Sequence, residues 1–416
     1  MKSSIVSFLA MLIASSTLLA VTPAIASDYT LEVFGNANMD ETIDEDDVAY
    51  VEGIIDGTNE DTELADANYD GQVDERDIAQ IELIMRGEED DLTIIDESGK
   101  IITIKEPVER VVICHAMFAE VLRSLRTEDR IVGIPSYMAD YVVFYPELSK
   151  LPTIGGASTP DSEAIVSLNP DLVIVYGTWA DNLENDLKDV APVVRLTYRP
   201  FSTTEKDITT LGYIVGKENE AEELIQFFEQ PLSTVQENVA TLSDDEKPRV
   251  YSEYTDYRTH AKGSGLHDVL IMAGGINIAS DITTDASSVP FIDPEWVIAQ
   301  NPDIIVRRAL KSDASCGYDE DDPTQMKALR DNILNRSETA NVTAIKNGDV
   351  YCYSTDILTG SNYWIGILYM AKLLHPDLFE DLDPQAIHQE YLTRFQRLDY
   401  DLDEHGIFFY PPLEMS

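Results

Sequence analysis

Two acidic segments near the N-terminus carry side-chain oxygens at alternating positions. In the second segment, Gly71 stands at place 6 of a loop that begins at Asp66. Oxygen ligands at places 1, 3, 5, 7, 9 and 12 wrap one Ca²⁺, and glycine at place 6 supplies the left-handed backbone that the sharp turn needs. This spacing predicts a calcium-binding loop. Its candidate ligands, with place 7 contributing a carbonyl oxygen, are Asp66, Asn68, Asp70, Gln72, Asp74 and Asp77.

The first segment repeats this pattern thirty residues earlier. Asn36 at place 1 is neutral and Glu41 stands where glycine is usual, so we expect weaker calcium binding from a smaller ligand charge and a strained turn. A simple solvated acidic run does not explain a regular repeat in which charges alternate with apolar positions. The candidate ligands here are Asn36, Asn38, Asp40, Thr42 (through its carbonyl), Asp44 and Asp47.

Each loop is followed by apolar residues at helical spacing. Val48 corresponds to Ile78 at the same thirty-residue interval, and Gly57 and Gly87 stand where the two helices are expected to stop. This arrangement of loop and helix, with no helix before the loop, resembles a dockerin domain. The resemblance implies that residues 28–90 form a small all-α module with calcium as its cofactor and a cohesin-like protein as its partner.

The positions just before the last calcium ligand limit this resemblance. Many dockerins carry a recognition pair of serine or threonine type there, whereas this chain has Glu45-Asp46 and Glu75-Arg76. The module could therefore dock to a surface protein of another kind, or it could serve as a stalk that calcium makes rigid.

A longer repeat organises the rest of the chain. The segment from Glu163 to Val175 (EAIVSLNPDLVIV) recurs from Glu295 to Val306 (EWVIAQNPDIIV). In both copies a short amphipathic stretch is followed by Asn-Pro-Asp and an unbroken apolar run, which predicts a helix, a tight turn and a buried parallel strand. Strands covered on both faces are typical of α/β layer folds. We therefore predict an α/β protein with two three-layer lobes that face each other across a ligand cleft.

Residues 107–380 resemble the substrate-binding proteins of ABC importers for iron-siderophores, cobalamin and haem. The order and spacing of several motifs carry this resemblance: Pro107–Ile113, Asp129–Ile134, the two Asn-Pro-Asp segments, Ala273–Ala279, Ala344–Tyr351 and Ala371–Pro376. It implies two α/β lobes joined by a single long helix. It also implies that the ligand is a small-molecule metal chelate or corrinoid and that the partner is an ABC permease dimer.

The N-terminus has the pattern of a secretory signal. Lys2 precedes an apolar run from Ile5 to Leu19, and Ala24-Ile25-Ala26 offers a small-residue cleavage site. We expect a secreted or cell-surface protein, outside the cytoplasmic membrane. An uncleaved anchor is the alternative, because the stretch approaches the ~20 apolar residues that cross a bilayer. The predicted organisation is a signal peptide (1–26), a dockerin-like module (28–90), a hairpin linker (91–106), a first lobe (107–200), a connecting helix (201–243) and a second lobe (244–400).

Candidate ligand contacts follow the predicted strands, because ligands of open α/β sheets lie at the carboxyl ends of the strands. Aromatic rings could embrace a macrocycle or catechol, and Arg could neutralise carboxylates. Arg307 and Arg308 are neighbours at the end of a predicted strand. Because successive side chains of a strand point to opposite faces, one of the two must point away from the cleft. The main candidates are His115, Tyr137, Trp179, Arg199, Tyr257, Arg258 and Arg308, with Tyr141, Tyr198, Tyr254, His260 and Arg307 as further ones. Cys114-His115-Ala-Met117 could also be read as a haem-iron or copper ligand set, but one apolar Cys and one packed Met are enough to explain it structurally, and this explanation is favoured.

Composition excludes several functions. The net charge of −48, from 77 acidic and 29 basic residues, opposes binding to nucleic acid and to anionic membranes. The sequence has no nucleophile elbow, no phosphate-binding loop and no paired-histidine zinc motif, so we do not expect this protein to be an enzyme. Three cysteines cannot form a disulfide scaffold. Cys316 and Cys352 could pair and leave Cys114 free, or all could be buried thiols.

The repeated glutamates have two interpretations. In the family that the chain resembles, one surface glutamate per lobe docks onto arginines of the permease, and the matching positions are Glu163 and Glu295. Alternatively, both only stabilise the positive end of a helix. A competing function is a cell-surface assembly or adhesion protein with a calcium docking module and a ligand-binding head that takes no part in transport.

Overall fold

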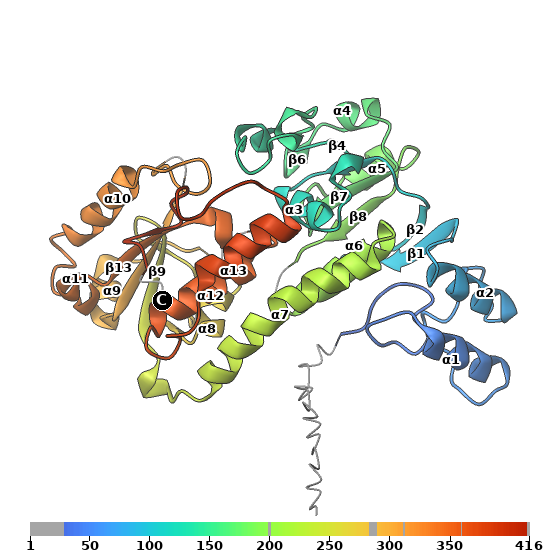
Figure 1. Ribbon diagram of the computed structural model, residues 1–416, viewed down its shortest axis with the longest axis horizontal. Coiled ribbons are helices and arrows are strands. Elements are labelled where there is room, and N and C mark those ends of the chain that lie inside the picture. The colour runs from blue at the N-terminus through green and yellow to red at the C-terminus, as the bar shows by residue number, and fades with distance from the viewer. Residues whose placement is uncertain (1–28, 199–200, 283–288, 311–312, 359, 414–416) are drawn as a thin grey trace, which may run out of the picture.

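The computed structural model describes residues 29–198, 201–282, 289–310, 313–358 and 360–413. The signal segment predicted over residues 1–26 and the candidate ligand contact Arg199 lie outside these ranges. Within them, a small N-terminal module precedes two α/β lobes, and helices α6 (Phe201–Ile214) and α7 (Glu218–Ala240) join one lobe to the other (Figure 1).

The N-terminal module contains helices α1 (Glu45–Ile55) and α2 (Glu75–Ile84), each beginning at place 10 of a predicted calcium loop. The carboxylates of Asp44 and Asp74 accept hydrogen bonds from backbone N–H groups of the first turn and so cap the two helices. A capping oxygen satisfies donors that the helix itself leaves unpaired, which explains why both helices begin here.

The predicted hairpin linker is present and is joined to the module. Strands β1 (Asp91–Ile95) and β2 (Ile101–Lys105) pair antiparallel. Val33 of the module forms a β-bridge with Ile94, and the N–H of Phe34 donates to the carbonyl of Thr93 at 2.9 Å. Backbone hydrogen bonds therefore join the module directly to the hairpin.

Parallel strands in the order β4-β3-β7-β8 form the sheet of the first lobe. Leu172 and Ile174 of β7 pack in one buried cluster, whereas Val173 and Val175 pack in another on the opposite face. The sheet is thus buried on both faces between helices. The elements of this lobe are β3 (Val111–Ile113), β4 (Ile131–Gly133), β5 (Gly155–Gly156), β6 (Thr159–Pro160), β7 (Leu172–Tyr176), β8 (Val193–Leu196), α3 (Ala116–Ser124), α4 (Ser162–Ser167) and α5 (Leu183–Leu187).

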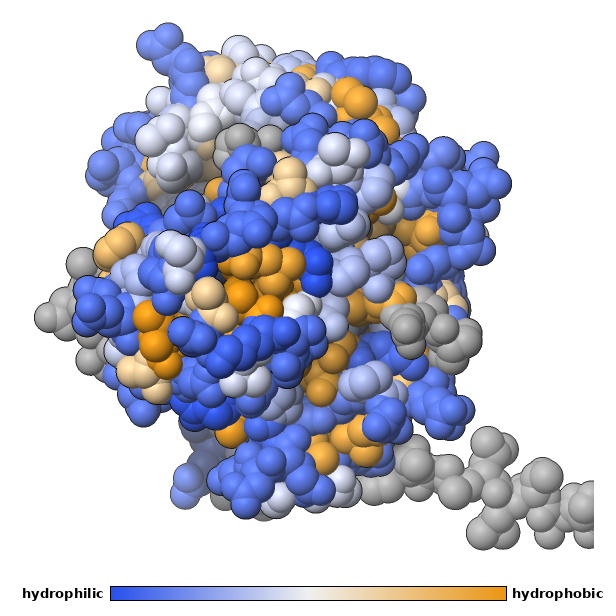
Figure 2. Space-filling view, turned by 90° about the vertical axis from the view of Figure 1, so that its left-hand side faces the viewer, coloured by the Kyte–Doolittle hydropathy of each residue, from blue (hydrophilic) through white to orange (hydrophobic). Residues whose placement is uncertain are grey.

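The sheet of the second lobe has the order β10-β9-β12-β13-β14, with β11 beside β9. Strands β9, β12 and β13 run parallel, and β10 and β14 add antiparallel edges. Hydrophilic side chains cover most of the outer face of this lobe (Figure 2). Its elements are β9 (Arg249–Thr255), β10 (Arg258–Thr259), β11 (Ile276–Asn277), β12 (Ile304–Ala309), β13 (Val350–Ser354), β14 (Phe409–Tyr410), α8 (Gly265–Met272), α9 (Pro294–Gln300), α10 (Thr324–Leu334), α11 (Thr343–Asn347), α12 (Tyr363–Leu374) and α13 (Pro384–Glu390).

The two Asn-Pro-Asp segments form the same structure in both lobes. Helix α4 leads into β7, and α9 leads into β12, as the repeat predicts. Asn169 and Asn301 both adopt left-handed backbone, with φ of 47° and 45°. Asparagine tolerates this conformation better than most residues, which explains its place at both turns.

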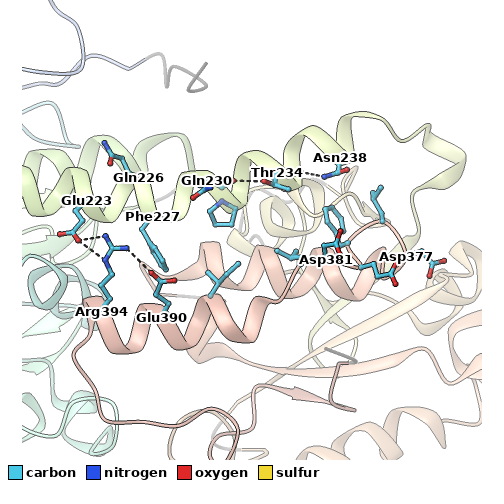
Figure 3. A pocket seen from close by; sticks show the side chains of 16 residues that line it. Glu223, Gln226, Phe227, Gln230, Thr234, Asn238, Asp377, Asp381, Glu390 and Arg394 are labelled. Atoms are coloured by element: carbon cyan, nitrogen blue, oxygen red, sulfur yellow. Dashed lines mark hydrogen bonds and ion pairs between the residues drawn. The ribbon is translucent and has the colours of Figure 1, made fainter. Parts of the chain in front are cut away.

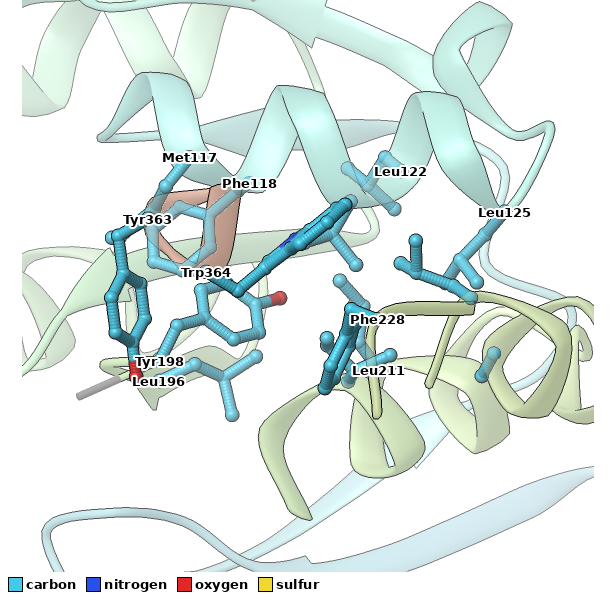
Figure 4. Close-up of a cluster of buried hydrophobic side chains, with 14 of the residues drawn as sticks. Met117, Phe118, Leu122, Leu125, Leu196, Tyr198, Leu211, Phe228, Tyr363 and Trp364 are labelled. Carbon is cyan, nitrogen blue, oxygen red and sulfur yellow. The ribbon is translucent and has the colours of Figure 1, made fainter. Parts of the chain in front are cut away.

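The connecting helix predicted over residues 201–243 is two helices instead of one. Gly216, with φ of 61°, lies between α6 and α7 and permits the break. Phe228 of α7 stacks on Trp364 of α12 with ring centroids 5.9 Å apart, and Phe118 of α3 lies in the same buried cluster (Figure 4). The connecting helices therefore share one hydrophobic core with both lobes.

The structure also bears on the considered disulfide and on membrane-spanning helices. Cys114, Cys316 and Cys352 are all buried thiols, so the bridge considered for Cys316 and Cys352 does not form. Among the described residues, no helix is long and apolar enough to cross a membrane.

Candidate functional site

Two hollows among the described residues lie between the lobes, and Arg308 lines both. The smaller has a volume of about 190 Å³ and is lined by His115 from the first lobe and Tyr318 from the second. The larger, about 690 Å³, is lined by Tyr176 from the first lobe and residues 262–268 from the second. Together they form the inter-lobe cleft, which has the size of a small-molecule site.

His115 lies at the centre of an aromatic wall of the cleft. Its ring centroid is 5.4 Å from that of Tyr176, 5.8 Å from Trp179 and 6.1 Å from Tyr137. His115 also caps α3, because its Nδ1 accepts from the N–H of Met117 at 3.2 Å. The neutral ring therefore carries its proton on Nε2, which is a hydrogen-bond donor.

The neighbours Arg307 and Arg308 point in opposite directions, as strand alternation requires. Arg307 is buried and pairs with Asp313 at 2.7 Å and with Glu253 at 3.5 Å. The guanidinium carbon of Arg308 lies 4.3 Å from the centre of the Tyr254 ring, and its Nε is buried without a hydrogen-bond partner. No carboxylate among the described residues forms an ion pair with Arg308. The cleft thus presents an arginine without an ion-pair partner among the described residues, although Glu120 and Asp356 line the same smaller hollow.

The larger hollow has a local positive character in a protein of net charge −48. Lys262 and Arg308 line it together with the carboxylate of Asp268. Helix α8 begins at the same place, where the hydroxyl of Ser264 accepts from the N–H of His267 at 3.4 Å. The positive end of the helix dipole adds to the two cations. The hollow is suited to an anionic group of a ligand.

A buried carboxyl lines the smaller hollow. Glu120 accepts hydrogen bonds from the hydroxyl of Tyr145 at 3.2 Å and from that of Ser361, at the start of the second lobe's α12, at 3.1 Å. Burial raises the pKa of Glu120 to about 7, although the nearby Arg123 lowers it. Near neutral pH the carboxyl is therefore close to its titration midpoint and can donate or accept a hydrogen bond.

Some predicted contacts lie away from the cleft. Tyr257 donates its hydroxyl to Glu338 at 2.6 Å, and Arg336 lies 4.7 Å above its ring, so side chains of its own lobe hold it. Arg258 is exposed on the short strand β10, and neither residue lines either of the two hollows described above. Strand-end position alone placed both in the candidate set, but the tight turn before β10 directs them elsewhere.

Two aromatic candidates also differ from expectation. Tyr198 is fully buried against Phe118, with ring centroids 5.7 Å apart. Trp179 is 39% exposed and touches the cleft through His115 and Tyr176 without lining a hollow itself. The predicted residues that the structure brings together at the cleft are His115, Tyr137, Tyr141, Tyr254, His260 and Arg308.

The sequence reading missed several residues that line the cleft. Tyr176 is the last residue of a predicted strand, so its position could have identified it. Asp356 lies in a 3-10 helix two residues after the end of β13, so its position after a strand could have identified it as well. Tyr318 comes from a loop of the second lobe that no local pattern places, so its contribution follows from tertiary packing alone.

The second predicted calcium loop is organised around a buried carboxylate. Asp77 accepts from the N–H of Asn68 at 3.1 Å through Oδ1 and from that of Asp74 at 2.8 Å through Oδ2. Asp66 accepts from the N–H of Asp70 at 3.0 Å. The side-chain oxygen of Asn68 is buried without a hydrogen-bond partner, which is consistent with an oxygen kept for a cation.

The first loop repeats this geometry. Asp47 accepts from the N–H of Asn38 at 3.0 Å and from that of Asp44 at 2.8 Å. Burial raises the pKa of Asp47 to about 6. The strain predicted at Glu41 is absent, because the left-handed residue of this loop is Met39, with φ of 63°. Place 4 is left-handed in both loops, at Met39 and at Tyr69 with φ of 54°, whereas only the second loop is also left-handed at place 6, at Gly71 with φ of 90°.

The predicted ligands of each loop are close in sequence, but their side chains do not converge on one point. Within the residues that the structure describes, no three His, Cys, Asp or Glu side chains converge as a metal site requires. In the second loop Arg76 pairs with Asp70 and, at 2.7 Å, with Asp74. Burial raises the pKa of Asp77, and the charge of Asp66 adds to this. The donor set and its burial fit Ca²⁺, and calcium stays a prediction.

The repeated glutamates occupy equivalent places in the two lobes. Glu163 and Glu295 lie in the first turns of α4 and α9, and both are exposed. The caps of these helices are Asp161 and Asp293, whose carboxylates accept from the N–H groups of the two glutamates at 2.9 and 2.8 Å. Among the described residues, neither glutamate side chain has an ion-pair or hydrogen-bond partner. The glutamates are therefore not the capping residues, whereas their first-turn positions agree with the interpretation that they stabilise the positive end of each helix.

Comparison with known proteins gives a consistent picture. Residues 111–356 match the family described as periplasmic binding protein. The chain is 28% identical over 302 residues to an uncharacterized ABC transporter substrate-binding lipoprotein, YvrC, of Bacillus subtilis, covering 70% of this chain and 87% of the relative. It is 26% identical over 216 residues to a cobalamin-binding protein of Halobacterium salinarum, covering 51% and 57%.

A solved structure shows the same fold. The TroA-like periplasmic binding protein FepB from Veillonella parvula superposes with a TM-score of 0.63 at 24% identity, covering 78% of this chain and 99% of that one. The N-terminal module precedes the matched residues 111–356.

Proposed function

Because the chain belongs to the periplasmic binding protein family, a class of solute-binding proteins and not of enzymes, we propose that it captures an anionic metal chelate or corrinoid for an ABC permease. The ligand would lie in the inter-lobe cleft, with the aromatic wall around His115 on one side and Arg308 on the other. The protein acts outside the cytoplasmic membrane in this proposal, as expected from the secretory pattern of its N-terminus.

Arg308, which has no ion-pair partner among the described residues, carries this proposal. Its Nε is buried without a hydrogen-bond partner, and such a donor is costly unless an acceptor, here an anionic group of the ligand, pairs with it. Chelates such as ferric siderophores combine anionic groups with broad aromatic or apolar faces. Tyr254 stacked below Arg308 and the rings around His115 suit such a face. The volume of the larger hollow, about 690 Å³, is within the range of small-molecule sites.

The test compares Arg308→Ala with Arg258→Ala. Arg308→Ala should weaken binding of an anionic chelate by about 1.5 to 3 kcal/mol, the usual contribution of a charge-assisted contact. Arg258→Ala should leave affinity unchanged, because Arg258 lines neither hollow. The ligand panel contains cobalamin, haem and ferric siderophores, and native mass spectrometry of protein from its source identifies any retained ligand. Equal losses in both variants, or no binding by any panel member, would reject the proposal.

For the N-terminal module, the proposed cofactor is calcium, one ion in each loop. The ligands would be the side-chain and carbonyl oxygens already named for the two loops. The buried carboxylates Asp47 and Asp77 and the unpartnered oxygen of Asn68 support this assignment. When bound, the ion supplies positive charge that offsets repulsion among these carboxylates.

Glu163 and Glu295 are the proposed contacts with the permease dimer. Both are exposed, equivalent in the two lobes and not needed as helix caps, since Asp161 and Asp293 fill that role. A pair of equivalent carboxylates suits a partner with twofold symmetry.

The module also has features of a docking surface. Met39 and Tyr69 occupy the same place in the two loops, Ile55 and Met85 correspond in the two helices, and all are exposed by 39% or more. Duplicated exposed apolar side chains favour binding to a cohesin-like or other surface protein. This second role is compatible with transport, because it would tether the receptor near its permease.

A further inference from the structure

A groove lies on the surface between α7 and the segment that follows α12, away from the inter-lobe cleft. It has a volume of about 750 Å³ and does not share any lining residue with the cleft. Figure 3 shows it from close by, with α7 along one side and α13 facing it. The proposed solute-binding function does not use this groove.

The wall formed by α7 is polar but uncharged along most of its length. Gln226, Gln230, Thr234 and Asn238 line it at intervals of four residues, so they form one stripe along the helix (Figure 3). The stripe spans about 18 Å at 1.5 Å per residue, or between three and four helical turns. Amides and hydroxyls on this wall can exchange hydrogen bonds with an elongated partner.

The opposite wall is acidic. Asp377, Glu380 and Asp381 follow one another on a short loop, and all three are exposed. No basic side chain among the described residues pairs with them. The ammonium of buried Lys372 donates to the carbonyls of Phe379 at 2.8 Å and Glu380 at 3.0 Å, which holds this loop in place from below. The three carboxylates are thus presented outward on a fixed backbone.

The floor is apolar and one end is closed by an ion-pair cluster. Phe227, Pro231 and Leu382 contribute half-buried apolar surface between the two walls. At the end of the groove, Arg394 pairs with Glu223 at 2.7 Å and Glu390 at 3.3 Å. The cation that lines the groove is therefore already neutralised, and the remaining charge of the groove is negative.

We propose that this groove binds a basic amphipathic helix of a partner protein. Its apolar face would cover the floor, lysines or arginines along one flank would meet Asp377, Glu380 and Asp381, and neutral polar residues along the other flank would meet α7. This is the helix-in-groove mode of recognition, with charge complementarity setting the orientation of the helix. A second copy of this chain is a poor occupant, because its net charge of −48 would add to the repulsion.

The probe is a fluorescent amphipathic peptide of about 14 residues, enough for the three to four turns of the groove. It carries leucines at helical spacing, lysines on one flank and glutamines on the other. A scrambled peptide of the same composition has the same charge without the amphipathic pattern. Fluorescence anisotropy with the full chain, at about 0.15 M salt to screen distant charges, gives the affinities.

The test variant is Asp377→Asn/Glu380→Gln/Asp381→Asn, and the matched control is Glu60→Gln/Asp61→Asn/Glu63→Gln, three exposed acids of the N-terminal module. We expect the groove variant to lose about tenfold in affinity and the control less than about twofold. Leu382→Asn, with unchanged thermal unfolding, should also weaken binding. Equal losses in groove and control variants, or equal binding of the scrambled peptide, would show general attraction to an acidic surface and overturn the proposal.

Discussion

Ile43, inside the first predicted calcium loop, donates its backbone N–H to the hydroxyl oxygen of Tyr213 on α6 at 3.0 Å. Tyr29 of the module lies 3.1 Å from Thr209 of the same helix, oxygen to oxygen, and Lys206 pairs with Glu32 at 3.0 Å. The N-terminal module is therefore packed against the connection between the lobes, and its first loop contacts α6 directly.

Removing the Tyr213 hydroxyl should destabilise this contact. Tyr213→Phe leaves the N–H of Ile43 without its acceptor at a buried site, which costs about 1 kcal/mol or somewhat more. The free energy of unfolding, measured by chemical denaturation in excess Ca²⁺, should fall accordingly. Tyr69→Phe is the control, since Tyr69 is exposed and should unfold as the parent does. Identical stability of all three proteins would show that the contact contributes nothing.

Calcium should order the N-terminal module. The two lobes should stay folded when a chelator removes the ion. Without a cation, Asp66, Asp74 and their neighbours repel one another, so chelation should lower the helical content and the thermal stability of the module. Calorimetric titration of the full chain should show heat of binding, and Asp66→Ala or Asp77→Ala should remove most of the signal from the second loop. Glu75→Ala, next to the loop ligands but not among them, should titrate normally. Absence of binding heat in the parent protein would remove the calcium assignment.

Charge reversal at the repeated glutamates should separate docking from folding. Glu163→Arg with Glu295→Arg should keep ligand affinity and abolish stimulation of the permease ATPase in reconstituted vesicles. The capping variants Asp161→Ala and Asp293→Ala should each lose about 1 kcal/mol of folding stability and should still support transport. Normal transport by the charge-reversed protein would leave the two glutamates without a docking role.

Glu120 should make stability depend on pH around neutrality. Burial raises its pKa from 4.5 to about 7, so the folded protein binds one more proton than the unfolded chain between these values. Its contribution to stability is complete below about pH 4.5 and is lost as pH rises through about 7. Arg123 and Asp356 face the same carboxyl with opposite effects on its pKa.

The matched variant is Glu120→Gln, which keeps an oxygen acceptor for Tyr145 and Ser361 without a titrating proton. Compared with the parent, its free energy of unfolding should fall less between pH 4.5 and 7 and should be relatively higher at pH 8. Denaturant titrations across this range measure the difference. Parallel pH profiles for the two proteins would contradict the raised pKa.

Local patterns in the sequence were sufficient for the secondary structure that builds each lobe. The runs 172–176 and 304–306 lie in strands β7 and β12, because a strand buried on both faces needs an uninterrupted apolar segment. Asn-Pro-Asp marks both turns, since asparagine adopts the left-handed backbone found at Asn169 and Asn301. These features depend on neighbours in the chain, which the sequence displays.

Tertiary structure alone decided which side chains face the cleft. Arg308 lies near the end of β12 and Arg258 begins β10, but packing leaves the first between the lobes and the second on the surface. Tyr318 reaches the cleft from a loop whose course depends on contacts far away in sequence. The packing of Ile43 against Tyr213, 170 residues later, is of the same kind. Such contacts are selected by the shape of the whole core, and no local spacing encodes them.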